Sequence, residues 1–545
     1  MTAQGWVAYG PMGAFGGPPA AQPAEGSTLG PPHGPDPHRR PELGDVRRLA
    51  KRGLDLAGRT ARADEQPTLT ALIAAHLDAG GPDAPIESQR WARYEGVNMQ
   101  RALDAWLAEP GRTHRSLGVP AAVDMGLAEL VAGSSLYGMP PLRPVGIARV
   151  NLASGPDEVQ PCDSSAVHLV HDADGRRAVL FARLADPRHG RDHCSVEILA
   201  DAPGAASAIS EQLRHLSAQH NAYRGHVLSL GQDPFGYGGG LLNFHRRPEL
   251  TREQLVLHDD VLASIERQVV GVARHRDALL AGGQHLKRGV LLYGPPGVGK
   301  THTVRYLSAS LRDTTVLLIS GEALELIGLA CSVARALTPA LVVVEDVDLI
   351  AEDRGMHPGQ HPLLFQLLNE MDGLAGDSDV CFLLTTNRAD LLEPALAARP
   401  GRVDQAIEIA LPDLEARRRL FELYVGTLRL HAAPDRVEAV LARAEGVTAS
   451  FLKELARRAA LFALDRDPSD GSDQSDPGGR SDPGGRSDPA GRSDRTEAGT
   501  PAPTVTADDL DAAIDDLLDA RNLMTRRLLG AGGDDAAEHD PLLPG

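Results

Sequence analysis

The chain has 545 residues and a formal net charge of −19 at pH 7, and this acidic balance disfavours nucleic acid as a partner. No run approaches the about 18 apolar residues of a transmembrane helix, so no membrane span is expected. The four cysteines are scattered and lack CxxC spacing, which predicts neither a zinc site nor a disulfide framework and favours a reducing, cytoplasmic setting. The excess of Ala, Gly, Pro and Arg is typical of a GC-rich bacterial genome.

The first half of the chain carries no motif with an evident chemistry. Residues 1–44 contain nine Gly and nine Pro and are predicted to be disordered, because they bury too little apolar surface to offset ordering entropy. Residues 45–230 are predicted to form an α+β region, as one domain or two subdomains. Residues 231–249, which include a GYGGG run, are interpreted as a linker. The elements expected in 45–230 are helices at about 45–79, 87–107 and 205–219 and strands at 166–170, 177–184, 195–199 and 224–230.

The second half has the rhythm of an α/β domain. Short apolar runs recur at 290–293, 316–319, 341–344, 380–385 and 406–409, and continuous Val/Leu runs suit strands buried on both faces of a parallel sheet. Two SDPGGR repeats and one SDPAGR repeat lie within 467–503 and have no apolar face, which predicts a disordered insertion. A helical stripe resumes after Thr506, and 531–545 reads as a flexible tail.

A phosphate-binding motif stands between the first of these strands and a helix. The run GPPGVGKT, residues 294–301, matches GxxxxGK[ST] in the strand–loop–helix context that this motif needs. The glycines let backbone N–H groups face phosphate oxygens, the Lys ammonium reaches the β/γ-phosphates, and the Thr hydroxyl is a ligand for Mg²⁺. ATP and Mg²⁺ are therefore the expected cofactors, and the candidate binding residues are Gly294, Pro295, Pro296, Gly297, Val298, Gly299, Lys300, Thr301 and His302.

An acidic pair follows the third strand-like run. Leu341–Val344 leads directly into Glu345 and Asp346, and an apolar strand that ends in carboxylates is a Walker B pattern. One carboxylate is expected at the metal and the other at the attacking water, so Thr301, Glu345 and Asp346 are the candidate metal site.

These motifs, together with LLFQLLNEMDGL, LLTTNRADLLEPAL and ARPGRVDQAIEIALPD, resemble an AAA+ ATPase of the AAA clade in order and spacing. The resemblance implies a P-loop NTPase parallel sheet at 250–411 and a helical lid at 412–530, beside the separate α+β region. It also implies that Asn387 is the sensor near the γ-phosphate and that Arg399 and Arg402 are arginine fingers for a neighbouring subunit, in a ring that is usually a homohexamer. Residues 254–266 and 447–458 match regions that flank adenine.

Two positions depart from the family pattern. The usual acidic pair is Asp then Glu, and the order here is Glu345 then Asp346; we expect active but slow hydrolysis, because Asp is one methylene shorter. The pore-loop triplet of threading relatives begins with an aromatic residue, whereas the matching stretch here is Leu326-Ile327-Gly328. These aliphatic residues either grip an apolar segment or pack within the subunit.

The sequence thus predicts an ATP-hydrolysing, chaperone-like AAA+ ring with Asp346, Glu345, Asn387, Arg399 and Arg402 as catalytic residues. Hydrolysis would drive remodelling of a macromolecule, with protein favoured, and 45–230 would select the substrate or adaptor. The alternative is a low-turnover, ATP-gated scaffold or switch that signals through the N-terminal region. A nucleic-acid loader is disfavoured by the acidic balance.

Overall fold

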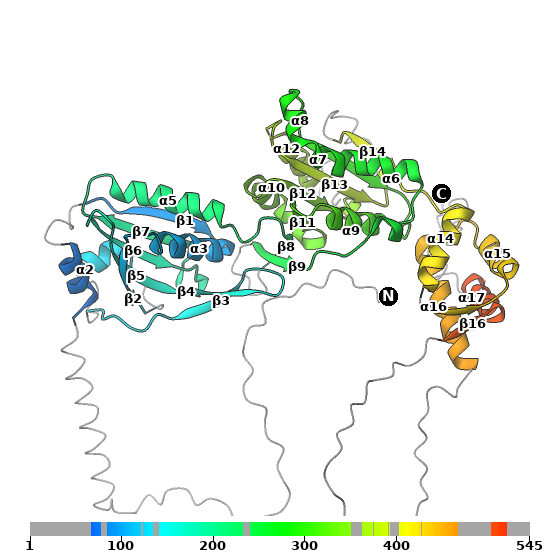
Figure 1. The fold of residues 1–545 in the computed structure, drawn as a ribbon, viewed down its shortest axis with the longest axis horizontal. Helices are drawn as coiled ribbons and strands as arrows, with labels where there is room; N and C mark the ends of the chain where they lie inside the picture. The colour runs from blue at the N-terminus through cyan, green and yellow to red at the C-terminus, as the bar shows by residue number, and fades with distance from the viewer. Residues whose placement is uncertain are drawn as a thin grey trace, which may run out of the picture. The chain divides into compact units, whose positions relative to one another are not determined.

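The computed structural model divides into two compact units, which are described separately (Figure 1). One unit comprises the described chain up to Tyr223 together with Gln232–Phe244, and the other comprises Arg224–Gly231 and the chain from His245 onward. The residues that the structure describes are 67–77, 84–120, 124–133, 141–232, 240–349, 362–373, 375–390, 392, 403–426, 428–466 and 503–519.

The N-terminal unit is an antiparallel sheet with helices on both faces. Its five strands are ordered β1-β7-β6-β5-β2, and each neighbouring pair is antiparallel. One face packs against α3 and α5 around Trp106, and the other packs against α2 and α4 around Phe181. A separate ribbon of β3 and β4 completes the unit. The elements are α2 (Leu69–Leu77), β1 (Glu87–Ala92), η1 (Arg93–Glu95), α3 (Gly96–Leu107), β2 (Thr113–Gly118), α4 (Leu127–Ala132), β3 (Arg149–Ala153), β4 (Val159–Asp163), β5 (Ser165–His171), β6 (Arg177–Arg183), η3 (Pro187–His189), β7 (His193–Ala200) and α5 (Ala205–Gln219).

The second unit contains the parallel α/β sheet that the apolar runs predicted. The strand order is β14-β10-β13-β12-β11-β8-β9, and the pairings from β14 through β8 are parallel. Strands β11, β12 and β13 are buried along their whole length, as continuous Val/Leu runs require. The elements are β8 (Val227–Gln232), η4 (Arg252–Gln254), α6 (Asp259–Glu266), η5 (Arg267–Gly271), α7 (Val272–Arg274), α8 (Arg276–Ala281), β10 (Arg288–Tyr293), α9 (Lys300–Ser310), β11 (Thr315–Ile319), η6 (Gly321–Leu326), α10 (Ile327–Ala336), β12 (Ala340–Val344), α12 (Pro362–Asp372), β13 (Val380–Thr386) and β14 (Gln405–Glu408). Strand β9 (Gly240–His245), last in this order, belongs to the N-terminal unit except for His245.

A helical subdomain follows the sheet and has its own apolar core. Helix α17 begins with a capping box in which Thr506 accepts a hydrogen bond from the Asp509 amide, as its sequence predicts. The short strand β16 pairs in parallel with β15, so the chain returns to the same subdomain after the repeat segment. The elements are α14 (Leu414–Val425), β15 (Arg429–His431), α15 (Pro434–Arg443), α16 (Ala449–Arg466), β16 (Thr504–Thr506) and α17 (Ala507–Leu518).

The structure corrects the expected boundary at 230 and the expected linker at 231–249. Strand β8 pairs with β11 in the nucleotide-type sheet, with Val227 opposite Val316, and β9 continues the same sheet. Arg247 fastens this segment, because its guanidinium donates to the carbonyls of Gly225 at 2.8 Å and Thr314 at 2.9 Å. The physical reason is that the apolar residues of β8 are buried by pairing with β11, which lies about 90 residues further along the chain.

Several expectations fall on residues that are not described. The predicted disordered stretches 1–44 and 531–545, and 467–503 apart from Pro503, lie outside the described residues. The same holds for Arg399 and Arg402. Among the described helices, none is long and apolar enough to cross a membrane.

Candidate active site

The glycine-rich loop joins β10 to α9 and needs glycine at specific positions. Gly294 has φ +148°, and a Cβ at this position would run into the backbone carbonyl of Ile409. Gly297 and Gly299 have φ +82° and +115°, which L side chains rarely adopt. The glycines therefore fix a backbone path that ends at the N-terminus of α9, where free N–H groups favour an anion.

Lys300 lies at the start of α9 and turns back toward the loop. Its ammonium donates to the carbonyls of Gly294 at 2.7 Å and Pro295 at 2.9 Å, and to Oδ1 of Asn387 at 2.7 Å. Burial lowers the pKa of Lys300, and the nearby charges of Asp346 and Asp348 oppose that shift. The ammonium is thus held beside the loop that would cradle phosphates.

The acidic pair ends β12 next to this ammonium. Burial raises the pKa of Glu345, while a hydrogen bond with the Thr301 side chain opposes the rise. Oxygen Oε1 of Glu345 is buried and has no hydrogen-bond partner among the described residues. A buried carboxylate oxygen without a donor, beside a threonine hydroxyl, fits the oxygen ligands that Mg²⁺ takes. The residues present therefore fit Mg²⁺.

Asp346 has an unusual backbone conformation, and its side chain contacts Asn387. Its φ of +52° lies in the left-handed region, where Asp is better tolerated than most residues. Its amide donates to the Thr385 hydroxyl at 3.1 Å, and Oδ1 accepts from Nδ2 of Asn387 at 3.3 Å. Asn387 therefore contacts both Lys300 and Asp346.

Asp348 supports this arrangement and was missed in the sequence. Its side chain is buried, and Oδ1 accepts hydrogen bonds from the Thr386 hydroxyl at 2.8 Å and from the backbone amide of Asn387 at 3.2 Å. It thereby fixes the end of β13 from which Asn387 projects. The signal was present as a third carboxylate two residues after the acidic pair.

The helical subdomain contacts the same loop. The Ser450 amide and hydroxyl both donate to the Gly297 carbonyl, at 3.1 and 3.3 Å. His302, on α9, shares a hydrogen bond of 3.1 Å with the Gln254 carbonyl, and burial lowers its pKa. The structure thus brings residues from 254–266 and 447–458 to the loop.

The expected pore-loop triplet, Leu326-Ile327-Gly328, is partly buried within the subunit. Ile327 is fully buried at the start of α10, and Leu326 is half-buried at the end of η6. Of the two interpretations of this stretch, packing within the subunit describes Ile327.

Residues 290–411 match the family model described as "ATPase family associated with various cellular activities (AAA)". This segment holds the loop, the acidic pair and Asn387 described above. Residues 290–411 are therefore an AAA-type ATPase domain. The expected α/β P-loop fold is confirmed.

Curated relatives share the AAA+ region. The chain is 31% identical over 278 residues to the proteasome-activating nucleotidase of Archaeoglobus fulgidus, covering 48% of this chain and 66% of that protein. It is 30% identical over 245 residues to the ATP-dependent zinc metalloprotease FtsH 3 of Symbiobacterium thermophilum, covering 43% of this chain and 39% of that protein. The chain thus spans less than two thirds of the length of each of these relatives.

Proposed function

We propose that this AAA+ protein hydrolyses ATP through attack of water on the γ-phosphate. The observation that carries the proposal is Asn387, whose amide oxygen accepts from Lys300 and whose amide nitrogen donates to Asp346. Lys300 would stabilise phosphoryl charge, while Asp346 and Asn387 would orient the water. In AAA+ ATPases, stabilisation of the phosphoryl charge and orientation of the attacking water occur together at the γ-phosphate.

The loop and its neighbours would hold the nucleotide. Backbone N–H groups from Gly294 to Thr301 would bind the phosphates, and His302 follows them on α9. The Thr301 hydroxyl and the Glu345 carboxylate would hold Mg²⁺, with Asp346 as the second carboxylate of the site. Mg²⁺ supplies charge neutralisation at the phosphates.

The assembly and substrate class extend this proposal. Two relatives, a proteasome-activating nucleotidase and a zinc metalloprotease, are named for proteolysis, which supports protein as the remodelled macromolecule. Arg399 and Arg402 would complete the site of a neighbouring subunit in a homohexameric ring. The N-terminal unit would bind the substrate or adaptor, and the Ser450–Gly297 contact would transmit the nucleotide state to the lid. A bacterial origin and a cytoplasmic setting stay predictions.

One observation favours the alternative of a low-turnover, ATP-gated switch. Ile327 is fully buried, so it does not offer a side chain to a threaded segment as the pore loop of a translocating ring does. The acidic pair in reversed order also fits slow turnover. In this alternative ATP binding would order an assembly that signals through the N-terminal unit.

Steady-state ATPase activity against protein concentration distinguishes the two functions. A ring ATPase predicts activity per subunit that rises cooperatively with concentration and falls by about 10³-fold in Arg402→Ala. The control is Arg214→Ala, an exposed substitution on α5 of the N-terminal unit. Tight ATP binding with negligible turnover in the wild type would reject the hydrolytic proposal and favour the switch.

A further inference from the structure

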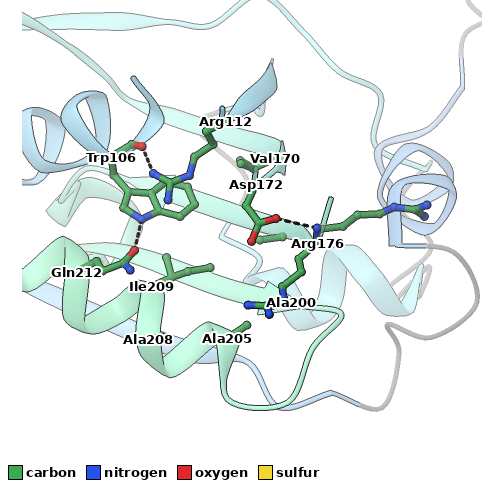
Figure 2. A pocket seen from close by; sticks show the side chains of 12 residues that line it. Trp106, Arg112, Val170, Asp172, Arg176, Ala200, Ala205, Ala208, Ile209 and Gln212 are labelled. Carbon is green, nitrogen blue, oxygen red and sulfur yellow. Dashed lines mark hydrogen bonds between the residues drawn. The ribbon is translucent and has the colours of Figure 1, made fainter. Parts of the chain in front are cut away.

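A small cavity lies in the N-terminal unit, between the sheet and α5 (Figure 2). Its volume is about 130 Å³. Val170 and two alanines from the sheet, Ala178 and Ala200, line it, and Ala205 and Ala208 line it from α5. Because an apolar cavity of about 150 Å³ holds one benzene-sized group, this cavity accommodates a group of that order rather than a nucleotide.

A buried arginine stands at one side of the cavity. The Arg112 side chain is only 11% exposed, and its guanidinium lies 3.7 Å above the Trp106 ring. It donates to the Trp106 carbonyl and pairs with Glu109 at 2.9 Å, while its Nε is buried without a hydrogen-bond partner among the described residues. The Trp106 ring is itself fixed, because its Nε1 donates to Gln212 at 2.7 Å (Figure 2). This side therefore holds a fixed cation whose charge is partly balanced by Glu109.

A second arginine stands at the mouth. The Arg176 side chain is 61% exposed and lies 3.9 Å from the Asp174 carboxylate, whose side chain is 73% exposed. Asp172 also lines the cavity, and its Oδ1 accepts hydrogen bonds from the backbone amides of Asp174 at 2.9 Å and Arg176 at 2.8 Å; Figure 2 shows the second of these. The Arg176 charge is therefore only weakly neutralised by its neighbours.

The N-terminal end of α5 adds to the positive potential at the cavity. This helix of 15 residues begins at Ala205, has no side-chain cap and carries no acidic residue in its first turn. Its partial positive charge therefore lies at the wall that Ala205 and Ala208 form. Together with the two arginines, this favours an anion over an apolar floor.

We propose that this cavity binds a carboxylate attached to a small apolar group. A carboxylate matches the planar guanidinium fork of the exposed Arg176, and the alanine floor takes an aliphatic side chain next to it. Two sources offer this chemistry: the C-terminal residue of a peptide and a free small carboxylic acid. An inorganic anion lacks the apolar part and leaves the floor unfilled.

The test is calorimetric titration of the full chain without nucleotide, so that a failure here leaves the proposed ATPase untouched. The probes are an acetylated pentapeptide that ends in valine, its C-terminally amidated twin, N-acetylvaline and inorganic phosphate. We expect the free-acid peptide to bind at least about tenfold more tightly than the amide, because the amide loses a charge-assisted hydrogen bond. Tighter binding of the peptide than of N-acetylvaline identifies a peptide C-terminus, and equal binding identifies a free acid.

Three variants locate the site. Ala208→Phe should abolish binding by filling the cavity, and because Ala208 is exposed this change does not disturb the core. Arg176→Ala should weaken binding about tenfold, whereas Arg214→Ala, exposed on the same helix outside the cavity, should change it less than about twofold. Circular dichroism verifies that each variant is folded. Equal binding of acid and amide, phosphate binding that matches the free acid, no binding at millimolar concentration, or full binding by Ala208→Phe would each overturn the proposal.

Discussion

Asn387 joins Lys300 to Asp346 through the two ends of one amide. Its Oδ1 accepts from the Lys300 ammonium at 2.7 Å, and its Nδ2 donates to the Asp346 carboxylate at 3.3 Å. The orientation of the amide follows from its partners, because an ammonium only donates and a carboxylate only accepts. Exchange of the two amide atoms would break both hydrogen bonds.

This relationship predicts the effect of Asn387→Ala. The variant should bind ATP within about threefold of the wild type but hydrolyse it about 100-fold more slowly, because loss of the amide misplaces the water and not the phosphates. Fluorescence titration of an ATP analogue and phosphate release measure the two quantities. Gln284→Ala, which removes an exposed amide in the same unit, should alter neither. Equal losses of binding and rate would show that Asn387 holds the nucleotide instead.

The backbone of the glycine-rich loop makes a second prediction. Gly294→Ala should abolish ATP binding, because φ is +148° and the new Cβ meets the Ile409 carbonyl. The matched control is Gly283→Ala, where φ is +72° but nothing lies within 4 Å. The control should lose about 1 kcal/mol of stability from left-handed backbone strain and keep ATP binding. Normal binding by Gly294→Ala would contradict the described loop.

Glu345 makes a prediction about metal dependence. Glu345→Gln should raise the Mg²⁺ concentration needed for half-maximal activity at least about tenfold, because the neutral amide lacks the negative charge that holds the cation. Paramagnetic resonance of Mn²⁺ with bound ATP gives a readout that does not depend on turnover. Glu422→Gln, an exposed change on α14, is the control. An unchanged metal requirement in Glu345→Gln would place the metal elsewhere.

His168 makes a prediction about acid stability of the N-terminal unit. Burial lowers its pKa from 6.5 to about 4, with the Asp163 charge opposing the shift and the His114 charge adding to it. Between pH 6.5 and about 4, His168 is therefore protonated in the unfolded chain but neutral in the folded unit. Stability should be unaffected above pH 6.5 and fall as the pH drops toward 4, by at most about 3 kcal/mol.

Urea unfolding at pH 7 and pH 4.5 measures this loss, with fluorescence from the buried Trp91 and Trp106 reporting on the N-terminal unit. His168→Gln retains a polar partner for the Ser116 hydroxyl, which lies 2.8 Å from Nδ1 of His168. The variant should show a smaller loss between the two pH values than the wild type. Parallel losses in both proteins would assign the acid sensitivity to other groups.

The sequence predicted the parts of the site that are contiguous in the chain. The run from Gly294 to Thr301 carries its own backbone geometry, so its spacing alone indicated a phosphate loop. The roles of Asp348 and Thr385 depend on β12 and β13 lying side by side, which no local pattern reveals. Asn387 entered only through the resemblance to AAA+ proteins.

The fold shows the same division between local and distant information. The apolar pattern of 224–230 predicted a strand, but the pattern does not identify the neighbouring strand, and β8 (Val227–Gln232) pairs with β11 instead of the N-terminal sheet. Arg417 has acidic neighbours in the sequence, which give no local sign that it is buried. It is buried, because its guanidinium donates to the Leu441 carbonyl at 3.2 Å and the Pro412 carbonyl at 3.0 Å.

Single-turnover hydrolysis by Asp346→Asn tests directly whether the Asp346 carboxylate orients the water that attacks ATP. The protein is loaded with ATP, the reaction is started with Mg²⁺, and phosphate is measured by rapid quench in the wild type and the variant. Asn suits the left-handed backbone at this position, so the fold and ATP affinity should be kept. We expect single-turnover hydrolysis to be at least about 100-fold slower in the variant, because the carboxylate that orients the water is gone. An equal rate in the two proteins would contradict it.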